Sequence, residues 1–293
     1  MNRRAVAVCL GLLLGAVAPA WAAGRAECNV IPSKILGTSV RYCAVLPESY
    51  DQNKTAKFAV LYQLHGLGQS EQNMVEMGGW SLLDDLRAKR KIGDFILVTP
   101  AAGSTFYVNS RDGRSRYEDF FIREFIPAIE RRYRAFGTSA HRGISGISMG
   151  GYGALHYAFK HPQMFAAVSA HSAALIEDFP EDLDLGEAEG RITPFGRPLD
   201  PAYWRANTPF TLARQNTAAI KRLKIYFDCG TEDNFGFEHG AKQLDEELTK
   251  LGVRHEYHLY PGRHNVAYFS AHLPASLEFQ SHAIAGSAPP SAP

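Results

Sequence analysis

Apolar and polar positions along the chain follow two periods, one typical of buried strands and the other of amphipathic helices. Nearly continuous apolar runs lie at residues 58–64, 95–99, 143–147, 165–170 and 223–228, and alternating runs lie at residues 39–47 and 254–260. Continuous apolar strands indicate burial on both faces, as in a parallel sheet, whereas alternation indicates one exposed face. Helical patterns lie between them, at residues 73–89, 117–133, 150–160, 241–251 and 266–279. This order predicts an α/β fold in which helices flank a mostly parallel central sheet.

Two features interrupt this regular alternation. Residues 172–215 form a long insert that is acidic between residues 177 and 189 and then carries Pro194, Pro198, Pro201 and Pro209. Inserts of this length commonly shape a ligand cleft, but a solvated excursion from the surface is an equally good interpretation. The second feature is Pro127, which lacks a backbone N–H and is expected to kink the helix at residues 117–133.

The segment Gly146-Ile147-Ser148-Met149-Gly150 lies where a predicted strand meets a predicted helix. It fits the pattern G-x-S-x-G, in which a serine on a tight strand-to-helix turn exposes its hydroxyl. The flanking glycines leave room for the turn and for close packing of the helix on the sheet. An ordinary glycine-rich turn is the alternative, but the strand before it and the helix after it favour a nucleophile at Ser148.

A serine nucleophile needs an imidazole to accept its proton and a carboxylate to orient that imidazole. Asp233 lies beyond the end of the late strand, in the kind of loop where catalytic groups gather. Asp228 lies within that strand and is expected to make structural hydrogen bonds, and Glu232 is the other rival for the acid. Of the 11 histidines, His264 has the loop position that follows the next strand. We therefore expect Ser148, Asp233 and His264 to form a catalytic triad in that chain order.

The negative charge that develops after attack on an ester carbonyl needs two backbone N–H donors. The residue after the nucleophile, Met149, supplies one of them, and a loop after an early strand supplies the other. Residues His65-Gly66-Leu67-Gly68 follow the strand at residues 58–64, which makes the Leu67 N–H the second candidate. A plain glycine-rich turn would also account for these four residues.

The two ends of the chain differ in composition from the rest. Residues 1–22 begin with Arg3 and Arg4, continue with a short apolar run and end with Ala20-Trp21-Ala22, a pattern typical of a secretory signal peptide cleaved near Ala22. The apolar run is too short for a good membrane anchor. Residues 284–293 are rich in alanine, serine and proline and are predicted to be a disordered tail. Residues 23–283 are then a single catalytic domain in a secreted or periplasmic protein.

Composition and charge narrow the range of partners. The chain has 293 residues, of which 45% are hydrophobic and 21% charged, as in ordinary globular proteins. Its formal net charge of +1, without a long basic run, argues against nucleic acid or an anionic membrane surface as a partner. No clustered cysteine and histidine ligand set appears, so we expect neither a metal nor a cofactor. The oligomeric state cannot be read from the sequence.

Three cysteines follow the expected signal peptide. Cys28 and Cys43 are 15 positions apart and flank the glycine-containing stretch at residues 35–38, which is suited to a hairpin turn. An oxidising compartment permits a disulfide there, whereas Cys229 lies at the end of a central strand and is expected to be a buried thiol. We therefore predict a Cys28–Cys43 bridge.

Together these residues resemble the putative-esterase family of α/β-hydrolases, which includes S-formylglutathione hydrolases, feruloyl and acetylxylan esterases, and mycolyltransferases. The resemblance runs from about residue 42 to residue 279 and rests on six segments. These are residues 64–67, 106–109, 117–121, 146–154, 228–235 and 261–264. It implies an α/β-hydrolase fold, with the insert placed after the strand that follows the nucleophile. It also implies the same triad and the same two backbone donors.

The residues and the resemblance agree on a secreted serine esterase that hydrolyses a small-molecule or carbohydrate ester through an acyl-enzyme. The alternative is an acyltransferase that passes the acyl group to a sugar hydroxyl, and a binding module that kept the fold is a third interpretation. Five aromatic residues are candidates for the wall of the substrate cleft, although core packing would explain any one of them. They are Trp80, Phe106, Tyr107, Trp204 and Phe235.

Overall fold

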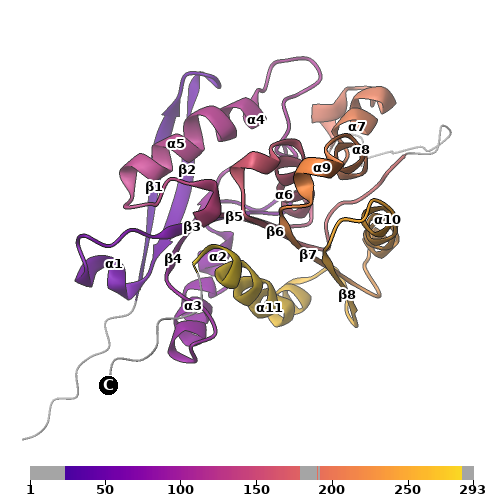
Figure 1. Cartoon of the computed structure of the whole chain (residues 1–293). Helices are drawn as coiled ribbons and strands as arrows, with labels where there is room; N and C mark the ends of the chain where they lie inside the picture. Colours follow the sequence, from indigo (N-terminus) through magenta and orange to yellow (C-terminus); the bar gives the residue numbers. More distant parts are fainter. Residues whose placement is uncertain (1–23, 179–189, 191, 286–293) are drawn as a thin grey trace, which may run out of the picture.

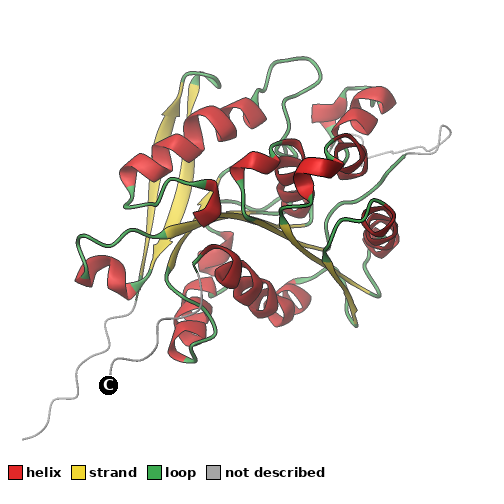
Figure 2. Cartoon of the chain, viewed as in Figure 1, coloured by secondary structure: helices red, strands yellow, loops and turns green. Residues whose placement is uncertain are grey.

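A single eight-stranded sheet forms the centre of the molecule. The computed structural model describes residues 24–178, 190 and 192–285. The spatial order of the strands is β1-β2-β4-β3-β5-β6-β7-β8 (Figures 1 and 2). β1 and β2 pair antiparallel, β2 joins β4 antiparallel, and every pair from β4 to β8 is parallel. The strands span β1 Arg25–Ser33, β2 Thr38–Leu46, β3 Ala59–Leu64, β4 Phe95–Pro100, β5 Arg142–Ile147, β6 Ala167–His171, β7 Lys224–Gly230 and β8 Glu256–Tyr260.

Helices cover both faces of this sheet, as the continuous apolar strands predict. Along β3, Val60, Tyr62 and Leu64 pack on one face, and Ala59 and Leu61 pack on the other. The first face is covered by α4 Tyr117–Phe120, α5 Ile126–Arg132, α6 Met149–Lys160, α8 Pro209–Gln215 and α10 Phe237–Lys250 (Figure 1). The second face is covered by α3 Gly79–Ala88 and α11 Val266–Ile284. The expected α/β-hydrolase arrangement is therefore confirmed.

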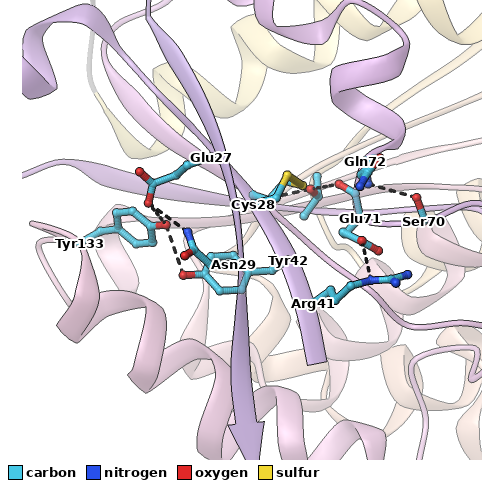
Figure 3. The surroundings of a disulfide bond; sticks show 11 residues. Glu27, Cys28, Asn29, Arg41, Tyr42, Ser70, Glu71, Gln72 and Tyr133 are labelled. Atoms are coloured by element: carbon cyan, nitrogen blue, oxygen red, sulfur yellow. Dashed lines mark hydrogen bonds and ion pairs between the residues drawn. A yellow bond between two sulfur atoms is a disulfide. The ribbon is translucent and has the colours of Figure 1, made fainter. Parts of the chain in front are cut away.

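The predicted disulfide is present. Cys28 on β1 and Cys43 on β2 lie directly opposite each other, and their Cα atoms are 4.0 Å apart. Beside the bridge, Arg41 forms an ion pair of 2.8 Å with Glu71, which lies in the loop that follows β3 (Figure 3). The hairpin thus also holds the loop that carries Leu67. Cys229 is a buried free thiol, as expected.

Two predicted helices have interruptions that the hydrophobic pattern did not locate. The helix expected at residues 73–89 is divided into α2 Asn73–Glu76 and α3, because Gly78 adopts a positive φ of 74° between them. The helix expected at residues 117–133 consists of α4, a π-helical turn at Phe121–Phe125 and α5. The π turn lies just before Pro127, which cannot donate the regular hydrogen bond. The expected kink therefore takes the form of a π-helical turn.

Prolines in the insert begin helices instead of only breaking them. Pro201 is the first residue of α7 Pro201–Asn207, and Pro209 is the first residue of α8. Asp200 accepts a hydrogen bond from the backbone of Tyr203, and Thr208 accepts one from the backbone of Thr211, so each helix has a side-chain cap. Two further short helices are α1 Glu48–Gln52 and α9 Thr217–Ile220.

Three segments with predicted properties lie wholly or mostly outside the residues that the structure describes. The signal peptide expected at residues 1–22, most of the acidic part of the insert and nearly all of the tail expected at residues 284–293 lie outside the described residues. Within residues 24–178, 190 and 192–285, no helix has the length and apolar character needed to cross a membrane.

Candidate active site

Ser148 stands at the junction between β5 and α6, on the turn that the G-x-S-x-G pattern predicts. Its backbone has φ 57° and ψ −118°, a conformation that non-glycine residues rarely adopt. A Cβ at Gly146 would collide with the backbone of Gly150, and a Cβ at Gly150 would collide with the backbone of Leu64. The glycines are therefore required for this tight turn, which lifts the Ser148 side chain above the end of the sheet.

The structure brings Asp233 and His264 together. Asp233 follows β7 and His264 follows β8, and the distance between His264 Nδ1 and Asp233 Oδ2 is 2.7 Å. The other carboxylate oxygen, Oδ1, accepts a hydrogen bond of 2.9 Å from the Phe235 N–H. Burial alone would raise the pKa of Asp233, but the hydrogen bonds from His264 and Phe235 outweigh it, and its pKa lies below the ordinary value. A charged carboxylate therefore holds the imidazole in place.

Phenylalanine rings surround the His264 imidazole. The ring centroids of Phe235, Phe237 and Phe269 lie 4.9, 5.6 and 5.2 Å from that of His264, each at a steep interplanar angle. Phe235 remains 58% exposed, so it stands at the rim of the site. This apolar surround leaves the ring few rotamers and limits the access of water to it.

Ser148 and His264 open into the same cavity, which has a volume of about 560 Å³. Apart from Ser148, His264, Gln69 and Asn265, its wall is formed by apolar side chains and by Gly66. The insert contributes Ala174, Ile176, Ile192 and Trp204 to that wall. Of the two interpretations of residues 172–215, the described part of the insert therefore supports the cleft-forming one.

Leu67 and Met149 line the cavity beside Ser148. Met149 is the first residue of α6, so its N–H has no acceptor within the helix. Leu67 lies in the loop after β3, where a Cβ at Gly66 would lie 3.5 Å from the Ser148 Cβ, so this loop passes close to the nucleophile. The two amides expected to bind the oxyanion thus flank the serine.

A buried histidine fixes the conformation of this loop. The Ala102 N–H donates to His65 Nε2 over 3.0 Å, so the proton of the neutral ring is on Nδ1, which donates to the Gly66 carbonyl over 2.8 Å. Burial lowers the pKa of His65, which favours that neutral form. The Tyr107 hydroxyl donates to the His65 carbonyl over 2.9 Å. The sequence placed His65 in the predicted oxyanion loop but did not indicate a role for its side chain.

Three of the five candidate aromatic residues line the cavity, and two do not. Phe106, Trp204 and Phe235 are part of the wall. Tyr107 is fully buried and is not part of the wall. Its hydroxyl donates to the His65 carbonyl, and its ring packs against Gly153. Trp80 lies on α3 and packs on the second face of the sheet, with its indole N–H donating to Asp84 over 3.0 Å. The predictions for Trp80 and Tyr107 as wall residues were therefore wrong.

The two rival acids face elsewhere. Asp228 is buried, and its Oδ2 lies 2.8 Å from His171 Nδ1, whereas its Oδ1 accepts a hydrogen bond of 2.8 Å from the Tyr268 hydroxyl. Glu232 is exposed and lies 3.6 Å from the Arg263 guanidinium. Asp233 is therefore the acid that contacts His264.

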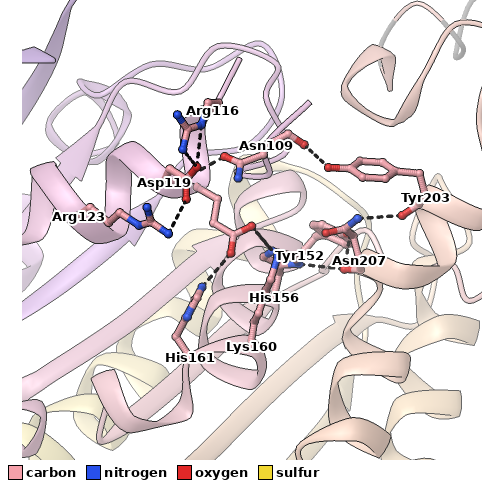
Figure 4. Close-up of polar contacts among 11 residues, drawn as sticks. Asn109, Arg116, Asp119, Arg123, Tyr152, His156, Lys160, His161, Tyr203 and Asn207 are labelled. Atoms are coloured by element: carbon pink, nitrogen blue, oxygen red, sulfur yellow. Dashed lines mark hydrogen bonds and ion pairs between the residues drawn. The ribbon is translucent and has the colours of Figure 1, made fainter. Parts of the chain in front are cut away.

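A buried carboxylate supports the wall that carries Trp204. Glu118 on α4 lies 3.2 Å from His156 Nε2, 2.8 Å from Lys160 Nζ and 2.8 Å from His161 Nε2. His156 and Lys160 lie on α6, and His161 directly follows its last residue (Figure 4). His156 Nδ1 in turn lies 2.9 Å from the carbonyl oxygen of Asn207, the last residue of α7. Glu118 and His156 thus connect α4, α6 and α7.

Burial alone would raise the pKa of Glu118, but the hydrogen bonds from His156 and His161 outweigh it, and its pKa lies well below the ordinary value. The sequence signal for this cluster was weak. Residues 117–121 contributed to the family resemblance, but nothing in the sequence indicated what Glu118 contacts.

The side chains that hold metal ions in proteins are mainly those of histidine, cysteine, aspartate and glutamate. In the described part of the chain, no group of three or more of these residues has an arrangement suited to a metal ion.

Comparison with known proteins places this chain in a family. Residues 33–279 match the family model described as "Putative esterase". An esterase of Mycobacterium tuberculosis is 31% identical over 245 residues, which is 75% of this chain and 51% of that protein. An acetyl esterase of Caldicellulosiruptor saccharolyticus is 24% identical over 270 residues, 85% of this chain and 95% of that protein.

A solved structure of a ferulic acid esterase superposes with a TM-score of 0.78 at 30% identity, covering 89% of this chain and 98% of that one. The chain spans about half the length of the first curated relatives that it matches. The family match, in contrast, extends over most of this chain and includes every strand from β2 to β8. The chain therefore belongs to the esterase family and has the α/β-hydrolase fold.

Proposed function

We propose that this protein is a secreted serine esterase that hydrolyses a carboxylic ester through a covalent acyl-enzyme. The observation that carries the proposal is the arrangement of three groups. Ser148 and His264 line one cavity, and His264 Nδ1 lies 2.7 Å from the buried carboxylate of Asp233. This is the arrangement of groups that an acyl-transfer reaction on a serine requires.

Each group has a defined role in the proposed reaction. His264 Nδ1 faces Asp233, which leaves Nε2 to take the proton of Ser148 as Oγ attacks the ester carbonyl. The N–H groups of Leu67 and Met149 stabilise the oxyanion. When the tetrahedral intermediate collapses, the alcohol leaves with the proton from His264. A water molecule, activated by the same imidazole, then attacks the acyl-serine and releases the acid.

The cavity favours an uncharged acyl group. Its wall is mostly apolar and includes the rings of Phe106, Trp204 and Phe269. Proteins similar to this chain include an acetyl esterase and a ferulic acid esterase. A small-molecule or carbohydrate ester is therefore the proposed substrate class, with no metal or cofactor in the reaction.

Export to the periplasm or beyond is the proposed location. The Cys28–Cys43 disulfide supports it, because such bridges persist in oxidising compartments. The composition of residues 1–22 supports it independently.

A chromogenic short-chain ester tests the proposal. Wild-type enzyme should release the chromophore with a burst that matches the enzyme concentration whenever deacylation is slower than acylation. Ser148→Ala should lower turnover by several orders of magnitude without a change in the circular dichroism spectrum. A variant that keeps more than a few per cent of the activity would exclude Ser148 as the nucleophile. Slow hydrolysis that sugar acceptors accelerate would instead identify an acyltransferase.

A further inference from the structure

We propose that a second hollow beside the catalytic cavity binds the alcohol portion of the ester, and that Gln69 selects alcohols that carry further oxygen atoms. The proposal rests on the proposed function and concerns the part of the substrate that leaves when the acyl-enzyme forms. This hollow, the side groove, has a volume of about 520 Å³ and shares Leu67 and Gln69 with the catalytic cavity. Its other lining residues are Gly68, Gly103, Ser104 and Gly190. The two hollows therefore adjoin at the loop that carries the Leu67 amide.

The side groove and the catalytic cavity differ in chemistry. Among the described residues that line the side groove, Leu67 alone has an apolar side chain larger than a hydrogen atom. Gly68 and Gly103 are exposed, and a Cβ at either position would meet no atom within 4 Å, so their backbone polar groups stay accessible. Burial of an apolar acyl group is favourable only against an apolar wall, which the catalytic cavity has. The side groove instead suits the hydroxylated part of an ester.

Gln69 is fixed where the two hollows meet, because both its backbone and its side chain bond to Gly66. The Gln69 N–H donates to the Gly66 carbonyl over 3.2 Å, and the Gly66 N–H donates to Gln69 Oε1 over 2.8 Å. A Cβ at Gly66 would lie 3.1 Å from Gln69 Oε1 and 3.5 Å from the Ser148 Cβ. The carboxamide of Gln69 is therefore held close to the nucleophile.

The carboxamide also has a defined direction. Because Oε1 accepts from the Gly66 N–H, Nε2 lies at the other end, and an exchange of the two atoms would set an NH₂ group against another donor. Within residues 24–178, 190 and 192–285, Gln69 Nε2 has no hydrogen-bond acceptor. Gln69 thus offers N–H donors to a ligand while its oxygen faces the loop. The matching ligand group is a hydroxyl or ether oxygen, as in a sugar, whereas a purely alkyl alcohol would leave the donors unpaired.

Two acetate esters of similar size test the role of Gln69. One is methyl glucoside acetylated at its primary hydroxyl, and the other is cyclohexylmethyl acetate, which has no oxygen beyond the ester. Both form the same acetyl-enzyme, so their kcat/KM values differ only through the alcohol. Gln69→Met should lower kcat/KM for the glucoside acetate relative to cyclohexylmethyl acetate by roughly 3- to 10-fold, as expected when a hydrogen bond between uncharged groups is lost. An equal loss for both esters would mean that Gln69 only supports the loop through Gly66, and would overturn the proposal.

Gln72 provides the matched control. It is an exposed glutamine of the same loop and lines neither the catalytic cavity nor the side groove. Gln72→Met should leave the ratio of the two kcat/KM values within about twofold of wild type, as expected for a surface substitution. An equal fall of the ratio in Gln72→Met would mean that any change in this loop has the same effect, and would overturn a specific role for Gln69.

A variant on the opposite side of the side groove tests which part of the ester lies there. Ser104 is exposed, and Ser104→Trp should narrow the groove. It should lower kcat/KM several-fold for both ring-bearing acetates and leave methyl acetate and methyl hexanoate within about twofold of wild type. A loss confined to methyl hexanoate would mean that the acyl chain occupies the side groove, and would overturn the proposal. Unchanged values for all four esters would overturn it as well.

A chromogenic ester separates this proposal from the proposed function. If wild type hydrolyses that ester and Ser148→Ala does not, but Gln69→Met and Ser104→Trp leave the kcat/KM ratios unchanged, only the binding of the alcohol is refuted. The same conclusion follows if wild type hydrolyses the chromogenic ester but not the glucoside acetate. If wild type hydrolyses none of the esters, the proposed function itself is refuted, and the proposal for the side groove with it.

Discussion

Replacement of Asp233 and Asp228 by asparagine, one at a time, should affect two different properties of the enzyme. The two residues are five positions apart in the chain and both are buried, so composition and depth do not distinguish them. Their partners do. Asp233 contacts the imidazole of His264, and Asp228 contacts His171 and Tyr268.

Asp233→Asn should abolish most of the activity and leave the fold in place. An amide at this position offers its N–H₂ group or its carbonyl oxygen to Nδ1 but no negative charge, so the imidazole loses both its tautomer and the stabilisation of its protonated form. The comparable change in serine proteases costs roughly 10⁴-fold in kcat. That factor corresponds to roughly 5 kcal/mol of activation free energy.

Asp228→Asn should act mainly on stability. The carboxylate and His171 are both fully buried, and their closest atoms are 2.8 Å apart. A hydrogen bond to a charged group is worth about 1.5–3 kcal/mol, and the lower part of that range applies here because Nδ1 and Oδ2 approach in a geometry that is poor for a hydrogen bond. A loss of about 2 kcal/mol corresponds to a fall of roughly 4–8 °C in the melting temperature of a domain of this size.

Two measurements on each purified variant decide between the residues. Thermal melts by circular dichroism report the stability, and initial rates on a chromogenic ester, measured well below the melting temperature, report the activity of the folded enzyme. If Asp228→Asn lost roughly 10⁴-fold in kcat at wild-type stability while Asp233→Asn stayed active, the assignment of the acid would be refuted.

Two other predictions concern stability. Replacing Cys28 and Cys43 together with serine should lower the free energy of unfolding by about 3 kcal/mol, the chain-entropy value for a loop of this length. Denaturant unfolding of wild type with and without dithiothreitol should show the same difference. Equal unfolding midpoints in the two conditions would contradict a formed bridge. Glu118→Gln should destabilise the protein at neutral pH, because the carboxylate has a lowered pKa in the folded state. That stabilisation is complete above the pKa of an unfolded glutamate, about 4.3, and fades as the pH falls further. The gap between wild type and Glu118→Gln should therefore narrow below about pH 4, and a gap that stays constant between pH 7 and pH 3 would refute this role of Glu118.

The sheet and the order of the catalytic residues were predictable because they depend on local patterns. Each continuous apolar run became a strand, and the turn at Ser148 depends on glycines that are adjacent in the chain. The hairpin bridge was predictable for the same reason, since Cys28 and Cys43 flank one short turn. The insert was harder, because the same prolines that break a helix also begin one when a capping residue such as Asp200 precedes them.

Other features depend on contacts between distant segments and left no local signal. The sequence around an aromatic residue does not distinguish a ring that faces a cavity from one that packs in the core. For this reason Tyr107 and Trp80 were wrongly predicted to line the cavity. The cluster at Glu118 joins residues from three helices.

Covalent labelling tests the central claim, that Ser148 is an activated nucleophile, most directly. A fluorophosphonate probe phosphonylates a serine whose proton is removed by an adjacent base and leaves a stable adduct. Peptide mass spectrometry after labelling should find one adduct per molecule, on Ser148, and esterase activity should fall in proportion to its formation. Ser148→Ala should take up no probe, and His264→Ala should take it up far more slowly. An adduct on another residue, or full activity after complete modification of Ser148, would contradict the account.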